Sequence, residues 1–341
     1  MPTTTPSTSP VVRLSSPGEI VASLPVLCGF PPQESVVALS LRGRRLGLTV
    51  RLDLPAPEHQ AAAADLVAAR MLGDGASRVA LVVLSEQGRR PELVEAFTER
   101  VGASGVEVLE ALHVADGRWT SYRCTGPCCP AEGTAVVETS AVMLAAAESA
   151  LLGKAVLRSR DELVASIAPP VLLAARAAER AYDAALERWA DDRLRTNPVV
   201  ARRLELRSAR ALLDAAREGR CPDLVAACTF AAPLEDVLVR DEIAGWALHR
   251  GDDVHALLQA VVPQLPVGGD APACTLLGWV AYARGEGALA GIAFDRALAS
   301  EPDYHLALLL MSLLEGGVDP AEVRRVMRPP SRRRSRRRRA C

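Results

Sequence analysis

Residues 79–84 read VALVVL, six apolar side chains in succession, three of them β-branched valines. An uninterrupted apolar run of this length is expected of a strand that is covered on both faces. Pro91 stands at a first-turn position and opens a predicted helix that continues to about Val101. The run therefore predicts a strand followed by a helix, the beginning of an α/β domain.

The segments around this run alternate strand-like and helical patterns in the same way. Glycine-containing stretches separate them and predict hairpin turns at 42–45 and at Asp116-Gly117. The predicted elements are a hairpin of Ser35–Leu41 with Leu46–Leu54, a helix over Glu58–Leu72, and a hairpin of Val106–Val114 with Arg118–Arg123. We therefore predict an α/β domain with a mixed sheet over residues 13–133.

Strand signals end near residue 134, and the remainder of the chain has helical periodicity broken by proline and glycine. The predicted helices cover 136–152, 160–167, 171–193, 198–217, 235–249, 253–262, 272–284, 287–300, 303–315 and 320–327. This pattern predicts an all-α domain over 134–327 that ends in stacked helical hairpins. Residues 1–12 and 328–341 are poor in apolar side chains, and we expect them to be disordered.

A period of 34 residues relates Ala247, Arg250, Gly251 and Ala256 to Ala281, Arg284, Gly285 and Ala290. Thirty-four is the tetratricopeptide period, and the second copy resembles that family. Its matching positions are Gly278, Gly285, Ala290, Phe294, Ala297 and Pro302. The first copy departs from the pattern at Ala260 and Pro263. We expect tetratricopeptide-like hairpins near 241–315 with Phe294 buried between units, and generic antiparallel helix packing is the alternative.

Several islands of sequence together resemble an uncharacterised bacterial family, the domain of unknown function 4192. The islands are Ser16-Pro17-x-Glu19, Pro25-x3-Gly29-Phe30-x-Pro32-x2-Ser35-Val36-Val37, Arg51-x-Asp53-Leu54-Pro55, Cys124-x3-Cys128-Cys129-Pro130-x2-Gly133, and a helical stretch from Leu276 to Ala307. Cys28 departs from the resemblance, because a leucine is more usual there. The resemblance implies an architecture and no activity.

Composition excludes several classes of protein. The first ten residues lack the positive start and apolar core of a secretory signal. The longest apolar run, Ala141–Leu152, is interrupted by Glu148 and is too short to span a bilayer. We therefore expect a cytoplasmic protein without membrane contact, whose cysteines are mostly thiols.

Three of the eight cysteines fall within six positions, as Cys124, Cys128 and Cys129. Three readings of this turn are open: a zinc site, a redox pair, or a buried turn of small polarisable side chains. Zinc needs a fourth ligand, for which His113 and Cys28 are the candidates. We expect no metal or cofactor, and zinc at this turn is the one candidate.

The loop from Gly29 to Ser35 is set by two prolines and enters the first strand of the predicted sheet. A ligand could lie against it, with Ser35 and Glu34 as polar contacts that the strand-end Asp53 could join, or the loop is a structural turn. No Gly-x-Ser-x-Gly elbow, P-loop or dinucleotide fingerprint is present in its required context. Whether the protein is an enzyme stays open, and these absences favour a binding function.

The C-terminal tail holds seven arginines, at positions 332, 333, 334, 336, 337, 338 and 339 (Arg332, Arg333, Arg334, Arg336, Arg337, Arg338 and Arg339). Without these seven, the 40 Lys and Arg fall to 33 against 41 Asp and Glu, so an acidic body of net charge −8 carries a basic tail. The tail could contact polyanions nonspecifically.

Three functions follow as hypotheses. The first is a protein-interaction or regulatory module that binds another protein through its helical domain. The second is an enzyme or small-ligand sensor with a site near the Gly29–Ser35 loop and the Cys124–Cys129 turn. The third is a nucleic-acid accessory protein that uses the arginine tail.

Overall fold

The computed structural model describes residues 16–124, 126, 129–151, 153–154 and 156–327, and the predicted disordered termini and Cys128 lie outside these ranges. The chain divides into two compact units that meet between Leu163 and Val164. The end of the strand signals predicts a domain boundary at 133–134, whereas the first compact unit extends to Leu163, because helix α4 (Ser140–Leu151) packs against α1 (Pro17–Cys28). The first unit is α/β and the second is all-α, as the sequence predicts.

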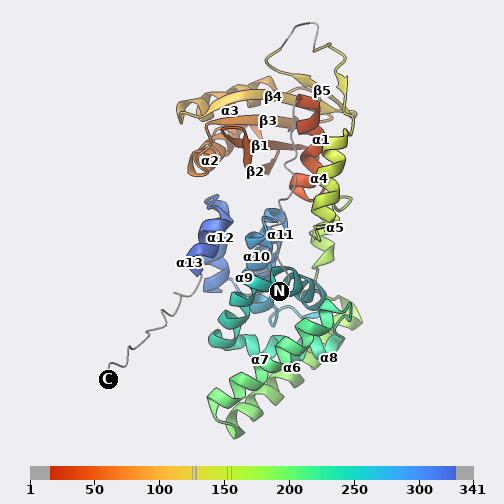
Figure 1. The fold of residues 1–341 in the computed structure, drawn as a ribbon, viewed down its shortest axis with the longest axis vertical. Coiled ribbons are helices and arrows are strands. Elements are labelled where there is room, and N and C mark those ends of the chain that lie inside the picture. Colours follow the sequence, from red (N-terminus) through yellow and green to blue (C-terminus); the bar gives the residue numbers. More distant parts are fainter. Residues whose placement is uncertain (1–15, 125, 127–128, 152, 155, 328–341) are drawn as a thin grey trace, which may run out of the picture. The chain divides into compact units, whose positions relative to one another are not determined.

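The first unit is built on a mixed sheet of six strands in the order β2-β1-β3-β4-β5-β6 (Figure 1). Its strands are β1 (Ser35–Arg42), β2 (Arg45–Asp53), β3 (Arg78–Leu84), β4 (Glu107–Ala115), β5 (Arg118–Ser121) and β6 (Thr134–Ala135). Its helices are α1 (Pro17–Cys28), the short η1 (Pro57–His59), α2 (Gln60–Gly73), α3 (Pro91–Ala103) and α4 (Ser140–Leu151). Strands β3 and β4 are parallel and are connected through α3, whereas the other pairs are antiparallel.

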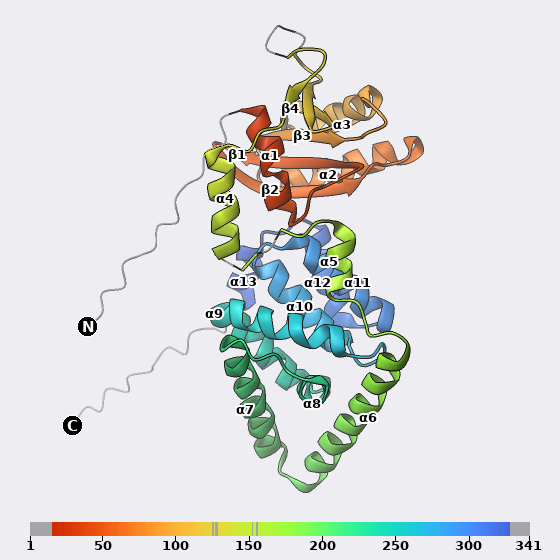
Figure 2. The same ribbon diagram turned by 90° about the vertical axis from the view of Figure 1, so that its right-hand side faces the viewer.

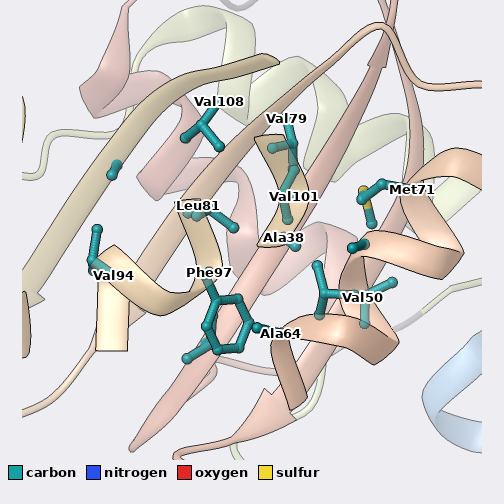
Figure 3. Close-up of a cluster of buried hydrophobic side chains, with 14 of the residues drawn as sticks. Ala38, Val50, Ala64, Met71, Val79, Leu81, Val94, Phe97, Val101 and Val108 are labelled. Carbon is teal, nitrogen blue, oxygen red and sulfur yellow. The ribbon is translucent and has the colours of Figure 1, made fainter. Parts of the chain in front are cut away.

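Each face of the sheet has its own apolar core, as the unbroken run in β3 requires. Val79, Leu81 and Val83 pack with side chains of α2 and α3, and Figure 3 shows Phe97 of α3 among them. Ala80 and Val82 point to the other face and pack with α1. We call these the α3 side and the α1 side of the sheet. Consecutive strand residues alternate between them, so parity along a strand decides which side a polar residue reaches.

The second unit contains helices only, among the residues that the structure describes. Helix α5 (Arg160–Ser166) crosses the boundary. The remaining elements are α6 (Leu172–Arg195), α7 (Pro198–Arg217), α8 (Leu224–Ala231), η2 (Ala232–Glu235), α9 (Val237–Val261), η3 (Val262–Gln264), α10 (Ala271–Ala283), α11 (Gly287–Ser300), α12 (His305–Glu315) and α13 (Pro320–Met327). Helices α6 and α7 diverge from the turn that joins them (Figure 2). Every residue of α10 is buried, which makes it the centre of this unit.

Within the described ranges, no helix is both long enough and apolar enough to cross a membrane.

Candidate functional site

Buried polar atoms without a partner concentrate at one end of the sheet. We call a buried nitrogen or oxygen unmatched when it has no hydrogen-bond partner among the described residues. In the α/β part of the chain the unmatched atoms are Ser35 Oγ, Arg51 Nε, Ser85 Oγ, Arg90 Nε and, on α4, Glu148 Oε1. The first four belong to one end of the sheet, where β2 and β3 finish and β1 begins. Native proteins rarely leave such groups unmatched without a functional or solvent-related reason.

Parity assigns Ser35, Arg51 and Ser85 to the two sides of the sheet, and Arg90 lies in the loop that leads into α3. Ser35 is followed by Val36 of the α3 side, so its hydroxyl lies on the α1 side. Arg51 follows Val50, which is also on the α3 side, and therefore shares the α1 side with Ser35. Leu84 packs on the α1 side, so Ser85 is directed to the α3 side, where α3 begins one residue after Arg90.

On the α1 side, three residues suggested by the sequence lie near Arg51. Ser35 pairs with Asp53 across the β1–β2 hairpin, and Asp53 binds Arg51 at 2.6 Å but is 79% exposed in its side chain. The guanidinium of Arg51 lies 5.9 Å from the centre of the Phe30 ring. Burial raises the pKa of the Cys28 thiol to about 11, against a smaller opposite effect of Arg51. Cys28 is thus held as a neutral thiol at pH 7 and is a poor nucleophile.

On the α3 side, the site is built from the β3–α3 loop, residues 85–90, and from two aromatic side chains. His113 Nε2 lies 3.0 Å from the carbonyl oxygen of Ser85, and its ring meets Tyr122 edge-on at 6.3 Å. The Tyr122 hydroxyl accepts the Arg90 backbone N–H at 2.7 Å. Burial raises the pKa of Tyr122, so the phenol stays neutral.

Contacts to other segments hold this loop in one conformation. Arg89 lies 4.3 Å from the Tyr122 ring centre and donates to Thr120 Oγ1 at 2.8 Å. Glu34 accepts the Glu86 N–H at 2.8 Å. The carboxylate of Glu86 in turn accepts the backbone N–H of Asp116 at 3.1 Å. The loop is therefore preorganised while Ser85 Oγ and Arg90 Nε stay unmatched.

Backbone strain occurs at the same end of the sheet. Glu34 has φ of 38° and Asp116 has φ of 49°, both in the left-handed region that favours glycine. Each residue costs conformational energy, and such residues gather at functional sites and turns. Here the strain aims the Glu34 carboxylate at the β3–α3 loop, since Glu34 and Glu86 are bonded to each other through it.

The position of this site also fits the topology. In open α/β sheets, ligands bind outside the carboxyl ends of parallel strands. β3 and β4 are the parallel pair, and Ser85 directly follows β3. Helix α3 begins with Pro91, which has no N–H, and no side chain caps its first turn. The first-turn amides of such a helix attract hydrogen-bond acceptors and negative charge.

The cysteine turn is only partly described, because Cys128 lies outside the described residues. The Cys124 N–H donates to Ser121 Oγ at 3.1 Å, and Cys129 packs against the α1-side core together with Cys28. His113 is on the opposite, α3 side, because its neighbour Leu112 packs on the α1 side. Cys28 and His113 thus cannot act as ligands of one shared ion.

Across the part of the chain that is described, no three His, Cys, Asp or Glu side chains are grouped so that they could hold a metal ion. The zinc and redox interpretations stay predictions. The seven tail arginines also fall outside the described residues, so polyanion contact stays a prediction.

Ser85, Arg90 and Tyr122 were not recognised from the sequence. A usable signal was present for Ser85, since it is the first polar residue after the apolar β3 run. Arg90 and Tyr122 carried no distinguishing pattern, because their proximity depends on how β5 returns beside β4.

One family model matches the chain, over residues 17–321, and its description is Domain of unknown function (DUF4192). No curated protein and no solved structure matches it.

Proposed function

We propose, from the premise that the chain belongs to the DUF4192 family over residues 17–321, that its α/β unit binds a small ligand rich in hydrogen-bond acceptors. The ligand would lie at the β3–α3 loop. The observation that carries this proposal is the pair of unmatched donors, Ser85 Oγ and Arg90 Nε, in a loop that other contacts hold rigid.

The chemistry of the donors defines the ligand. A guanidinium and a hydroxyl at the start of an uncapped helix favour a carboxylate or a phosphate. The neighbouring carboxylates of Glu34 and Glu86 accept backbone N–H groups, so these bonds partly offset their repulsion of an anion. The site offers binding groups in fixed positions, which suits a ligand sensor.

Thermal unfolding of the full chain tests this proposal. Phosphate or acetate should raise the melting temperature relative to chloride at equal ionic strength, because a ligand that binds only the folded state stabilises it. The rise should disappear in Ser85→Ala and in Arg90→Gln, and should persist in Arg44→Gln at the β1–β2 turn. An equal rise in chloride, or in the Ser85 variant, would contradict the proposal.

A second candidate function is the binding of a partner protein by the helical unit. Helix α6 buries only Ala178, Tyr182 and Ala185. Leu172 and Leu194, near its two ends, are 84% and 86% exposed. Val171 and Leu173 adjoin Leu172 and are 69% and 79% exposed, and contiguous exposed aliphatic side chains mark interaction surfaces. Affinity capture should recover a partner that is lost with Leu172→Asp.

The control for this capture is Leu72→Asp, on a 57% exposed position of α2. A partner that is lost equally with both variants would exclude α6 as the docking surface.

We also propose that α10 and α11 form a tetratricopeptide-like unit. Phe294 is fully buried, and a Cβ placed on Gly278 would lie 2.3 Å from its ring. Gly285, with φ of 78°, makes the turn between the two helices. These features support the unit that the 34-residue period predicts. Scanning the Gly278 and Phe294 positions, as described in the Discussion, tests it.

A further inference from the structure

A groove runs between α3 and the first half of β4, and one end of it reaches Tyr122, which also borders the ligand site proposed above. Two hollows of about 300 Å³ and about 410 Å³ form it, and both are lined by Thr98 of α3 and by Arg123. The register of β5 with β4 covers Leu112–Ala115, and the Tyr122 N–H still donates to the Ala111 carbonyl at 2.8 Å. From Glu107 to Glu110, the described part of the chain supplies no strand on this side of β4. The groove therefore has a helix as one wall and an open strand edge as the other.

Side chains occupy positions that a neighbouring strand would fill. Arg123 Nη1 donates to the Val108 carbonyl. The Ala111 N–H donates to Glu110 Oε1 at 3.0 Å, and Ser121 Oγ holds that carboxylate at 2.8 Å. Unpaired edges of a sheet are templates for another strand. These side chains can leave the edge by changing rotamer, and the backbone groups of β4 can then form hydrogen bonds with the backbone of a peptide.

The lining of the groove defines the side chains of such a peptide. Its floor contains Val94, Val106 and Val108, which are buried or nearly so. Three carboxylates line the two hollows, from Glu95, Glu99 and Glu107, against one cation, Arg123. Arg123 keeps its charge while it donates to a backbone carbonyl, but the three carboxylates outnumber it, so the rim favours positive charge.

We propose that this groove binds an extended segment of a partner protein that alternates apolar and basic side chains and adds as a strand to the open edge of β4. Successive side chains of a strand point to opposite faces. One set would therefore face the α3 side, where arginine stems lie over the valine floor and their guanidinium groups meet the carboxylates of α3. The valines would face the α1 side of the sheet. Backbone bonds supply affinity in this mode of recognition, and the alternating side chains supply specificity.

The probe is a fluorescein-labelled peptide of alternating valine and arginine, about six residues long, which is the usual length of a strand. The full chain should bind it in fluorescence anisotropy, and Glu95→Gln combined with Glu99→Gln should weaken binding about tenfold. Glu58→Gln, an exposed carboxylate before α2, is the matched control and should leave affinity unchanged. Peptides of alternating valine and glutamate should not bind.

Backbone pairing is separated from simple charge attraction by an N-methylated copy of the valine–arginine peptide. N-methylation removes backbone donors and keeps every charge, so binding should be lost. The proposal would be overturned if the methylated peptide bound as tightly as the unmethylated one. It would also be overturned if the unmethylated peptide bound the double glutamine variant as tightly as the wild-type chain.

The arginine tail of the chain itself is the competing occupant. Deletion of residues 328–341 should leave the affinity within about twofold. Tightening of about tenfold on deletion would assign the groove to the tail and overturn binding of a partner. Ser85→Ala should not alter the affinity for the peptide, so the proposed ligand site and the proposed peptide groove are tested independently of each other.

Discussion

Three buried serines at strand positions give opposite predictions for the same substitution. Ser35 and Ser40 of β1 are fully buried and Ser85 after β3 is 1% exposed. Ser40 Oγ donates to Asp74 Oδ2 at 2.5 Å, whereas the hydroxyls of Ser35 and Ser85 are unmatched. Replacement by alanine removes only one oxygen atom in each case. The free energy of unfolding should therefore report whether that oxygen is bonded.

The magnitudes follow from the bonding. A buried hydroxyl without a hydrogen bond destabilises the folded state by about 1–3 kcal/mol. Replacement by alanine removes this cost, but the small cavity that it leaves destabilises the protein slightly. We expect Ser35→Ala and Ser85→Ala each to raise the free energy of unfolding by about 1 kcal/mol. Ser40→Ala should lower it by about 1.5–3 kcal/mol, because the side chain of Asp74, 4% exposed, loses a donor to a charged acceptor.

Urea unfolding of the full chain, in buffer free of phosphate and carboxylates, measures these differences in the free energy of unfolding. The slope of that free energy against urea concentration should be the same for all variants. The ligand hypothesis requires the apparent gain of Ser85→Ala to vanish when the ligand is present, because only wild type can then bind it. If all three alanine variants lose similar stability, Ser35 and Ser85 are bonded in solution, and the argument for an unmatched site fails.

Three further predictions concern other parts of the chain. Phe294→Ala should lower the free energy of unfolding by about 3 kcal/mol. Gly278→Ala should be strongly destabilising in the wild-type chain but much less so in a chain that also carries Phe294→Ala. If urea unfolding shows that Phe294→Ala costs less than about 0.5 kcal/mol, the proposed packing is wrong. Burial raises the pKa of the Cys28 thiol from 9.0 to about 11, so as the pH rises the thiol ionises first in the unfolded chain. The free energy of unfolding should therefore fall between pH 9 and 11, by up to about 1.4 kcal/mol per pH unit relative to Cys28→Ala. Equal pH profiles of the wild-type and Cys28→Ala proteins would refute this prediction. Deletion of residues 331–341 should leave the melting temperature unchanged and remove most retention on heparin, and unchanged retention would refute the electrostatic role of the tail.

The sheet could be predicted from sequence because its signals are local. The hairpin of β1 and β2, the apolar β3 and the proline that opens α3 each show a period or a turn residue within a short window. Helix α1 was not predicted as a helix, although Ser16 caps it, Pro17 begins it and Gly29 ends it. Its internal Pro25 and nearly continuous apolar residues obscured the helical period.

Other features depend on contacts between elements. The break expected between the helices over 235–249 and 253–262 is confirmed, because α9 consists of two helices that meet at a kink with non-helical backbone at Arg250. Arg250 binds both Asp214 and Asp253 there, so the kink coincides with contacts that no window of sequence contains. The sequence does not predict helix α8, because it has only 8 residues and ends about one turn after the buried Cys228, which is too short to show a helical period.

The candidate site was partly predictable for a related reason. Ser35 was recognised because it closes a loop of prolines, which is a local signal. The sequence leaves open whether Cys28 or His113 lies nearer the cysteine turn, because it does not show on which side of the sheet each residue lies. Parity along β4 places His113 on the α3 side, since Leu112 packs with α1, and metal binding by the turn stays a prediction.

Two backbone irregularities of the sheet are held by side chains of different kinds, and the difference bears on peptide binding at β4. At the register shift between β1 and β2, the Leu48 N–H donates to Asp74 Oδ2 at 3.2 Å, and Ser40 Oγ donates to the same buried carboxylate. Moving Asp74 would leave these donors unmatched beside a desolvated charge, which is costly. Beside β4, Arg123 donates to the Val108 carbonyl, and its guanidinium regains full hydration or meets a carboxylate of α3 when it moves. The Val108 carbonyl that it releases is an acceptor for the backbone of an added strand, so this contact can be exchanged at lower cost than the one at Asp74.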